Sequence, residues 1–170
     1  MKNILFAIGI ELIFSGCRVP YCNQYERDIS FAFFLEDSWE WNRIDSFNGE
    51  VTVDYSTNDE RKVKLCFSQE EMDSIRTEMR RIDIMSYPTI YHPLPEDTTS
   101  FGWNVRVDPH PVYRLKIILS GKTKEIYWND DNFSQIKGAQ RLRRLMAMIQ
   151  RITKQKSVYQ QIPRKLRMIL

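Results

Sequence analysis

The sequence contains few of the residues that usually carry catalysis or hold metal ions. Its 170 residues include two histidines and three cysteines. His92 and His110 both stand beside prolines, and neither has the helix or strand spacing to a second ligand that one metal ion needs. There is no Gly-x-Ser-x-Gly elbow, and no cysteine near a histidine that could activate it. We therefore expect two exposed loop histidines, no cofactor and no metal, and we lean against an enzyme. An enzyme that uses a carboxylate with one of the histidines is the alternative.

A glycine-rich phosphate loop is also missing. Ser120-Gly121-Lys122-Thr123 looks like the end of one, but the motif needs a glycine at position 116, which is a lysine. The motif also needs a helix to follow, and its N-terminus would hold the phosphate. Residues 123–128 alternate as a strand does, so we expect a hairpin turn at Ser120-Gly121.

No long hydrophobic run is present at the start of the chain either. The apolar run Ile4 to Phe14 has eleven residues with Glu11 among them, whereas a spanning helix needs about 20. One cation, Lys2, precedes the run, and the small residues Ser15 and Gly16 follow it. This pattern predicts a secretory signal peptide over residues 1–16.

The end of that segment, Ile13-Phe14-Ser15-Gly16-Cys17, resembles the lipobox of bacterial lipoproteins. Phe14 and Glu11 depart from the usual pattern, which favours leucine three positions before the cysteine. The resemblance implies that Cys17 becomes the N-terminus and carries fatty chains such as palmitate, enough for stable membrane attachment. It implies a place in the bacterial cell envelope, at the outer membrane if the envelope is double. The alternative is a cytosolic protein with an ordinary hydrophobic first element.

Acidic residues are missing from the last part of the chain. Residues 132–170 contain ten Lys or Arg and no Asp or Glu, whereas residues 17–131 contain fourteen basic and twenty-one acidic residues. This asymmetry indicates contact between two parts of one fold, an acidic partner or an anionic membrane surface. We expect no nucleic-acid partner for a tethered envelope protein. The candidate residues for contact with an anionic surface are Arg141, Arg144, Arg151 and Lys154.

The three cysteines can be assigned to one lipid attachment site and one disulfide, which is consistent with an oxidising compartment. With Cys17 acylated, Cys22 and Cys66 remain as a possible disulfide that would tie the tether to the domain. The alternative is a buried free thiol at Cys66 on a strand and an exposed thiol at Cys22.

Alternating and compact apolar patterns predict a sheet. The expected strands are 29–35, 50–55, 62–67, 101–107 and a hairpin of 113–119 with 123–128, while 37–44 is a short strand or a turn. Ser68-Gln-Glu-Glu71 predicts a capping box that opens a helix. The apolar face of that helix is Met72, Ile75, Met79 and Ile82. The connection 85–100 contains three prolines and is long enough to be functional or mobile.

A second helix is expected from Ser134 or Ile136 to Lys154, followed by a docking segment or tail. Its apolar face consists of Leu142, Leu145, Met146, Ile149 and Ile152. Together these patterns predict an α+β fold: an antiparallel sheet (meander plus hairpin) with two amphipathic helices packed on one face. Residues 17–28 would be a lipidated tether and 29–170 a single domain with a basic C-terminal helix and tail.

This layout is similar to that of small uncharacterised bacterial lipoproteins. It implies a lipid-anchored, non-enzymatic binding or structural module of the envelope, which presents the 85–100 loop or a sheet edge to a partner. The alternative is an immunity or inhibitor lipoprotein that neutralises an envelope toxin or hydrolase.

Overall fold

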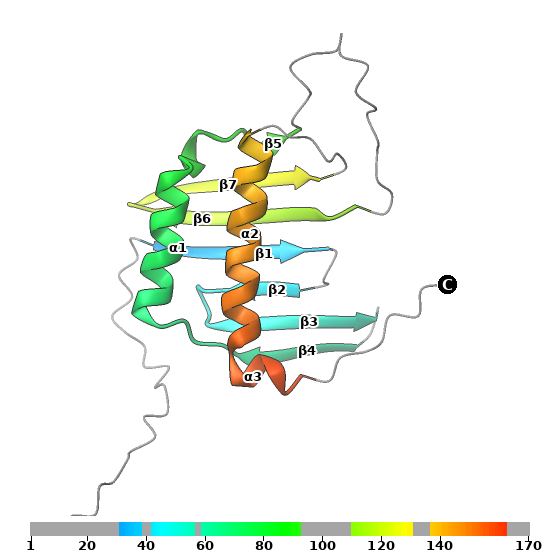
Figure 1. Cartoon of the computed structure of the whole chain (residues 1–170). Coiled ribbons are helices and arrows are strands. Elements are labelled where there is room, and N and C mark those ends of the chain that lie inside the picture. The colour runs from blue at the N-terminus through cyan, green and yellow to red at the C-terminus, as the bar shows by residue number, and fades with distance from the viewer. Residues whose placement is uncertain (1–30, 39–41, 57–58, 93–109, 131–136, 163–170) are drawn as a thin grey trace, which may run out of the picture.

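The computed structural model describes residues 31–38, 42–56, 59–92, 110–130 and 137–162, which form one sheet with helices over one of its faces (Figure 1). The predicted signal peptide, the tether with Cys17 and Cys22, the strand 101–107 and the tail after residue 162 lie outside these residues. The elements are β1 (Phe31–Asp37), β2 (Asn42–Asp45), β3 (Glu50–Ser56), β4 (Asp59–Lys64), α1 (Gln69–Arg81), η1 (Ile84–Ser86), β5 (Ile90–Tyr91), β6 (Val112–Leu119), β7 (Lys122–Asn129), α2 (Lys137–Gln155) and α3 (Ser157–Gln160).

The seven strands form an open sheet in the order β4-β3-β2-β1-β6-β7-β5. Strands β1 to β4 follow one another as an antiparallel meander, and β6 and β7 form the predicted hairpin. The hairpin joins the meander through β1, where Phe33 is paired with Ile117. The predicted α+β class is therefore confirmed. The antiparallel prediction is incomplete, because the short edge strand β5 runs parallel to β7.

The core lies between the sheet and the helices. Side chains of a strand alternate between its two faces, and β1 buries Phe33 and Leu35 completely on the helix side. Phe34, between them, is half-buried on the other side. Strand β1 therefore buries only its helix-side face completely, although its apolar run is compact. The face away from the helices is called the open face below.

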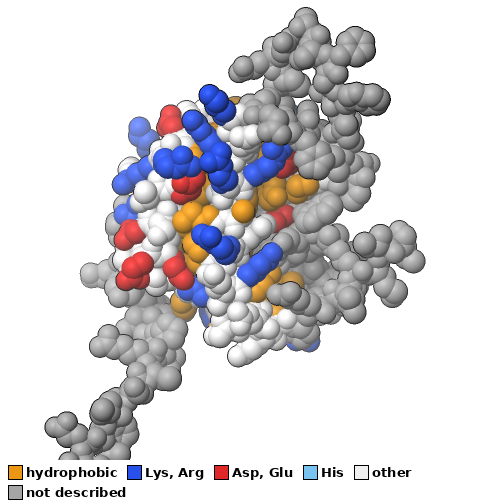
Figure 2. Space-filling view, viewed as in Figure 1, with side chains coloured by type: hydrophobic (Ala, Val, Ile, Leu, Met, Phe, Trp, Pro, Cys, Tyr) orange, Lys and Arg blue, Asp and Glu red, His pale blue; other side chains and the backbone are white. Residues whose placement is uncertain are grey.

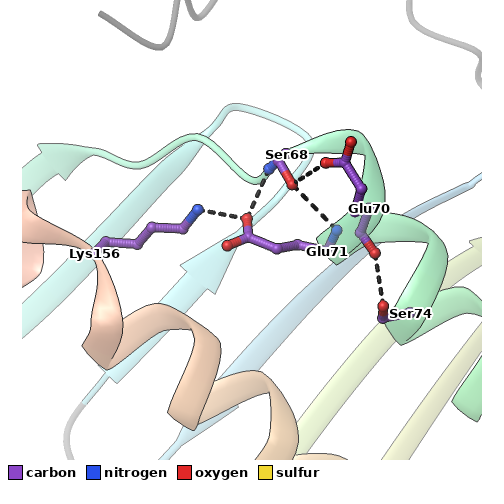
Figure 3. A network of polar contacts seen from close by, with 5 residues as sticks. All are labelled: Ser68, Glu70, Glu71, Ser74 and Lys156. Atoms are coloured by element: carbon purple, nitrogen blue, oxygen red, sulfur yellow. Dashed lines mark hydrogen bonds and ion pairs between the residues drawn. The ribbon is translucent and has the colours of Figure 1, made fainter. Parts of the chain in front are cut away.

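Helix α1 begins where the capping box predicted. The Ser68 hydroxyl accepts a hydrogen bond from the Glu71 backbone N–H at 3.3 Å, and the Glu71 carboxylate accepts from the Ser68 N–H at 2.7 Å (Figure 3). Ile75, Met79 and Ile82 of the predicted stripe are buried. Helix α2 likewise buries every predicted apolar position: Leu142, Leu145, Met146, Ile149 and Ile152. Both helices lie across the same face of the sheet (Figure 1).

Three boundaries differ from the sequence predictions. The strand expected over 62–67 is β4, Asp59–Lys64, which begins and ends three residues earlier, although the Leu65 N–H still donates to the Gly49 carbonyl at 2.9 Å. The connection expected to be irregular contains η1 and β5. The expected docking segment after α2 begins with α3 and buries Ile162. Within the described part of the chain, no helix is long and apolar enough to cross a membrane.

Candidate functional site

Two large apolar side chains lie exposed and side by side at one edge of the sheet. Ile90 of β5 and Tyr127 of β7 are register partners, with 63% and 47% of their surfaces exposed. Tyr127 is on the open face, because Ile126 and Trp128 on either side of it are buried under the helices. We call Ile90 and Tyr127 the edge pair.

A cluster of aromatic rings on the helix side of the same strands supports the edge pair. Trp128, 1% exposed, stacks on Tyr113 with ring centroids 5.2 Å apart and lies 6.1 Å from Tyr91. Tyr91 in turn meets Tyr87 edge to face at 5.2 Å. Such ring pairs add to the stability that burial alone provides. Strand β5 has only two residues, and these rings hold it against β7.

An ion pair fixes α2 to this aromatic cluster. The Arg143 guanidinium donates to both carboxylate oxygens of Asp130, at 2.9 and 2.6 Å, and lies 5.9 Å from the centre of the Trp128 ring. The hydrogen bonds that Arg143 donates to Asp130 raise the pKa of Arg143 above its usual value. A planar guanidinium fits both partners, whereas an ammonium group would lose the bidentate contact. The pair also joins the basic C-terminal part of the chain to its acidic part, one of the explanations of the charge asymmetry.

Gly138, in the first turn of α2, allows the helix to approach Tyr91 closely. A Cβ atom at Gly138 would lie 2.4 Å from the Tyr91 hydroxyl. The Tyr87 hydroxyl donates to the Gly138 carbonyl at 3.1 Å. Burial raises the pKa of both Tyr87 and Tyr91 above the ordinary value. The edge strand is therefore fitted against the backbone of α2.

The second surface is the outer side of α2. Arg141, Arg144 and Arg151 are exposed there. At 3.6 residues per turn they fall within an arc of about 80°, and we call them the arginine stripe. No ion pair joins any of the three to a carboxylate among the residues that the structure describes. Lys154, the fourth predicted contact residue, is half-buried about 60° further round the helix and has another contact.

Acidic residues of α1, unlike the arginine stripe of α2, form ion pairs. In α1, Glu78 pairs with Arg81 at 2.6 Å and Asp73 with Arg76 at 3.6 Å. The hydrogen bond from Arg81 lowers the pKa of Glu78. Between α1 and α2 lies a shallow groove of about 400 Å³, lined by Asp73, Ser74, Thr77, Glu78 and Met148. Figure 2 shows lysine and arginine side chains spread over this helical face, with several acidic side chains toward the side of α1.

Polar contacts beneath α2 were not predicted from the sequence. Gln150 donates to the buried Asp37 at the end of β1, and the Asn42 amide donates to the Tyr159 hydroxyl at 3.0 Å. These two hydrogen bonds hold α2 and α3 to the sheet at the end opposite the aromatic cluster. No sequence signal identifies them, because each contact joins residues that are more than a hundred positions apart.

The remaining predicted site residues are dispersed. His92 is exposed after β5, and His110 is half-buried before β6 and has a contact of its own. No group of three or more His, Cys, Asp or Glu side chains suited to a metal ion occurs within the described ranges. Cys66 is half-buried between β4 and α1 and is disulfide-bonded. Cys22 as its partner stays a prediction, and so does acylation at Cys17.

Comparison with known proteins assigns the chain to no family. No family model, no curated protein and no solved structure matches the chain.

Proposed function

We propose that the protein is a lipid-anchored binding module of the bacterial cell envelope. Residues 1–16 act as a signal peptide, Cys17 carries the acyl chains, and residues 17–28 tether the domain 29–170 to the membrane. The domain binds a protein partner through the edge pair. Its role is binding rather than catalysis.

The exposed edge pair is the observation that carries this proposal. Isolated exposed apolar residues are common, but a neighbouring Ile and Tyr on a rigid platform offer a small anchor of the kind that dominates binding energy. Tyr127 supplies a large ring at a low cost in conformational entropy. The aromatic cluster behind Tyr91 keeps both strands in place before the partner arrives, which reduces the ordering cost of association.

The disulfide at Cys66 supports the proposed location. Disulfides persist in oxidising compartments and are rare in the cytosol. An envelope protein that uses one cysteine for lipid and two for a disulfide accounts for all three cysteines of the chain. The lipobox-like segment before Cys17 supports the same compartment independently.

Photo-crosslinking in cells tests the proposal. A crosslinking amino acid at position 127 of the full chain is predicted to give one discrete covalent product in the membrane fraction. A crosslinker at position 62, exposed on the open face near the opposite edge, is the matched control and should give none. No product from position 127, or the same products from both positions, would contradict binding through the edge pair.

A competing variant sharpens the result. The double change Ile90→Ser and Tyr127→Ser should leave the fold intact, since both side chains are exposed. When the natural chain is produced together with the crosslinking protein it should compete for the partner and reduce the crosslinked product, whereas the double variant should leave the product unchanged. A toxin or hydrolase in the crosslinked product would assign the immunity function, and an envelope scaffold component would assign the structural one.

A further inference from the structure

The helical layer presents arginines that form no ion pair with any described residue, although Arg144 lies close enough to Glu78 to help lower the pKa of that carboxyl. Helix α2 carries six cations and no acidic residue. Arg143 is paired with Asp130, whereas the arginine stripe has no such partner among the described residues. In α1, Glu71, Asp73 and Glu78 each meet a cation, and the cation at Glu71 is Lys156, which follows α2. Glu70 accepts a hydrogen bond from the Ser68 hydroxyl. The arginines of the stripe, which form no ion pair, therefore lie on the α2 side of the helical face.

The stripe also has a shape that suits a flat surface. Arg141 and Arg151 are ten positions apart, which corresponds to about 15 Å along the helix axis. Half-buried Met148 lies between Arg144 and Arg151 on the same side, and the groove that it lines together with α1 is shallow. The stripe contains no aromatic residue. An extended, adaptable row of guanidinium groups without an aromatic anchor matches an array of phosphates better than a protein hot spot.

We propose that the arginine stripe binds the anionic phospholipid headgroups of the membrane to which the protein is anchored. This inference rests on the proposed lipid anchor, which holds the domain at the bilayer. Arg141, Arg144 and Arg151 donate hydrogen bonds to headgroup phosphates. The helical layer then faces the bilayer. Because the edge pair lies on the opposite, open face of the sheet, Ile90 and Tyr127 point away from the membrane toward the partner.

Vesicle partitioning tests the stripe without the acyl chains. The full chain with Cys17→Ser is mixed with vesicles of phosphatidylcholine alone and of phosphatidylcholine with phosphatidylglycerol. The measured quantity is the ratio of the two partition coefficients. Lys2 and the apolar run 4–14 are present in every variant, so their contribution cancels when variants are compared.

The test variant is Arg141→Gln, Arg144→Gln and Arg151→Gln together. The matched control removes the same charge from the open face by Lys62→Gln, Arg114→Gln and Lys116→Gln, all exposed positions. The stripe variant should lose preference for anionic vesicles by about fivefold per arginine and about a hundredfold in total. The control should change it by less than about twofold at moderate salt, where distant charges are screened. Circular dichroism and thermal midpoints establish that both variants fold.

Any one of three results would overturn the proposal. Either the stripe variant keeps its preference for anionic vesicles, or the control loses as much as the stripe variant, which would make the effect one of net charge. If the vesicles show no preference and an acidic protein is captured through the same arginines, the surface serves a protein and not lipid. Failure of the anchor itself would appear in the mass of the native protein and not in these partition ratios.

Discussion

Lys156 donates to the carboxylate of Glu71, a residue 85 positions earlier in the chain (Figure 3). The same carboxylate accepts from the Ser68 backbone N–H and so completes the cap of α1. Lys156 is the N-cap residue of α3, and its ammonium group lies 5.8 Å from the centre of the Phe67 ring. One carboxylate thus begins the first long helix and fastens the end of the second to it.

A double-mutant cycle measures this coupling. Glu71→Gln should lower the free energy of unfolding by about 1 kcal/mol, because it weakens the cap and the ion pair. Lys156→Gln should lower it by a similar amount or less. The two side chains are 29% and 22% exposed, so their coupling energy should be about 0.5–1 kcal/mol. Urea denaturation provides all four values, and a coupling energy of zero would show that the pair adds nothing to stability.

The close contact at Gly138 predicts a rescue. Glycine to alanine in a helix normally stabilises by about 1 kcal/mol, but Gly138→Ala should destabilise, because the new methyl group meets the Tyr91 hydroxyl. Tyr91→Phe removes that oxygen. The double variant should therefore be at least as stable as Tyr91→Phe alone. Thermal melts check this, and the expectation is wrong if alanine destabilises equally in both backgrounds.

The raised pKa of Tyr87 predicts loss of stability in alkali. The folded state retains the phenol proton at a pH where the unfolded chain loses it, near 10.0. The stabilising contribution is therefore complete below pH 10 and is lost as the pH rises toward the folded pKa. Tyr87→Phe should be less stable at neutral pH, because it loses the hydrogen bond to Gly138. The difference in stability between Tyr87→Phe and the natural protein should become smaller between pH 9 and 11, because only the natural protein loses stability as its Tyr87 ionises. A deficit that stays constant over this range of about two pH units would contradict the shift.

The disulfide predicts a matched pair of cysteine variants. If Cys22 is the partner of Cys66, then Cys22→Ser, Cys66→Ser and the double variant should lose the same stability, about 2–4 kcal/mol. Denaturation of the non-reduced and reduced proteins supplies the comparison. Unequal single losses, or a bridged peptide that contains Cys17, would assign the disulfide differently and remove the proposed lipid site.

Local signals accounted for the helices and the hairpin. The capping residues Ser68 and Glu71 fixed the start of α1, and the apolar stripes fixed which faces of α1 and α2 are buried. Ser120 and Gly121 both have positive φ, 52° and 75°, as the hairpin turn required. Each of these features depends on residues close together in the chain.

Non-local features could not be predicted in the same way. Strand β5 has two residues, too few to show a period. It pairs with β7 because the chain reaches that edge of the sheet after α1 and η1. Tyr127 could be assigned to the open face from its alternation with Ile126 and Trp128, but Ile90 carried no signal. The ion pairs of α1 and the unpaired arginine stripe depend on which side chains meet in space, and charge counts do not contain that information.

The proposed function depends on attachment of the protein to a bilayer through Cys17, and intact-mass spectrometry of the protein from the membrane fraction measures that attachment. The chain should begin at Cys17 and carry the added mass of fatty acyl groups, with the other two thiols oxidised. A full-length chain that retains Met1, carries no acyl group and is recovered from the soluble fraction would contradict it.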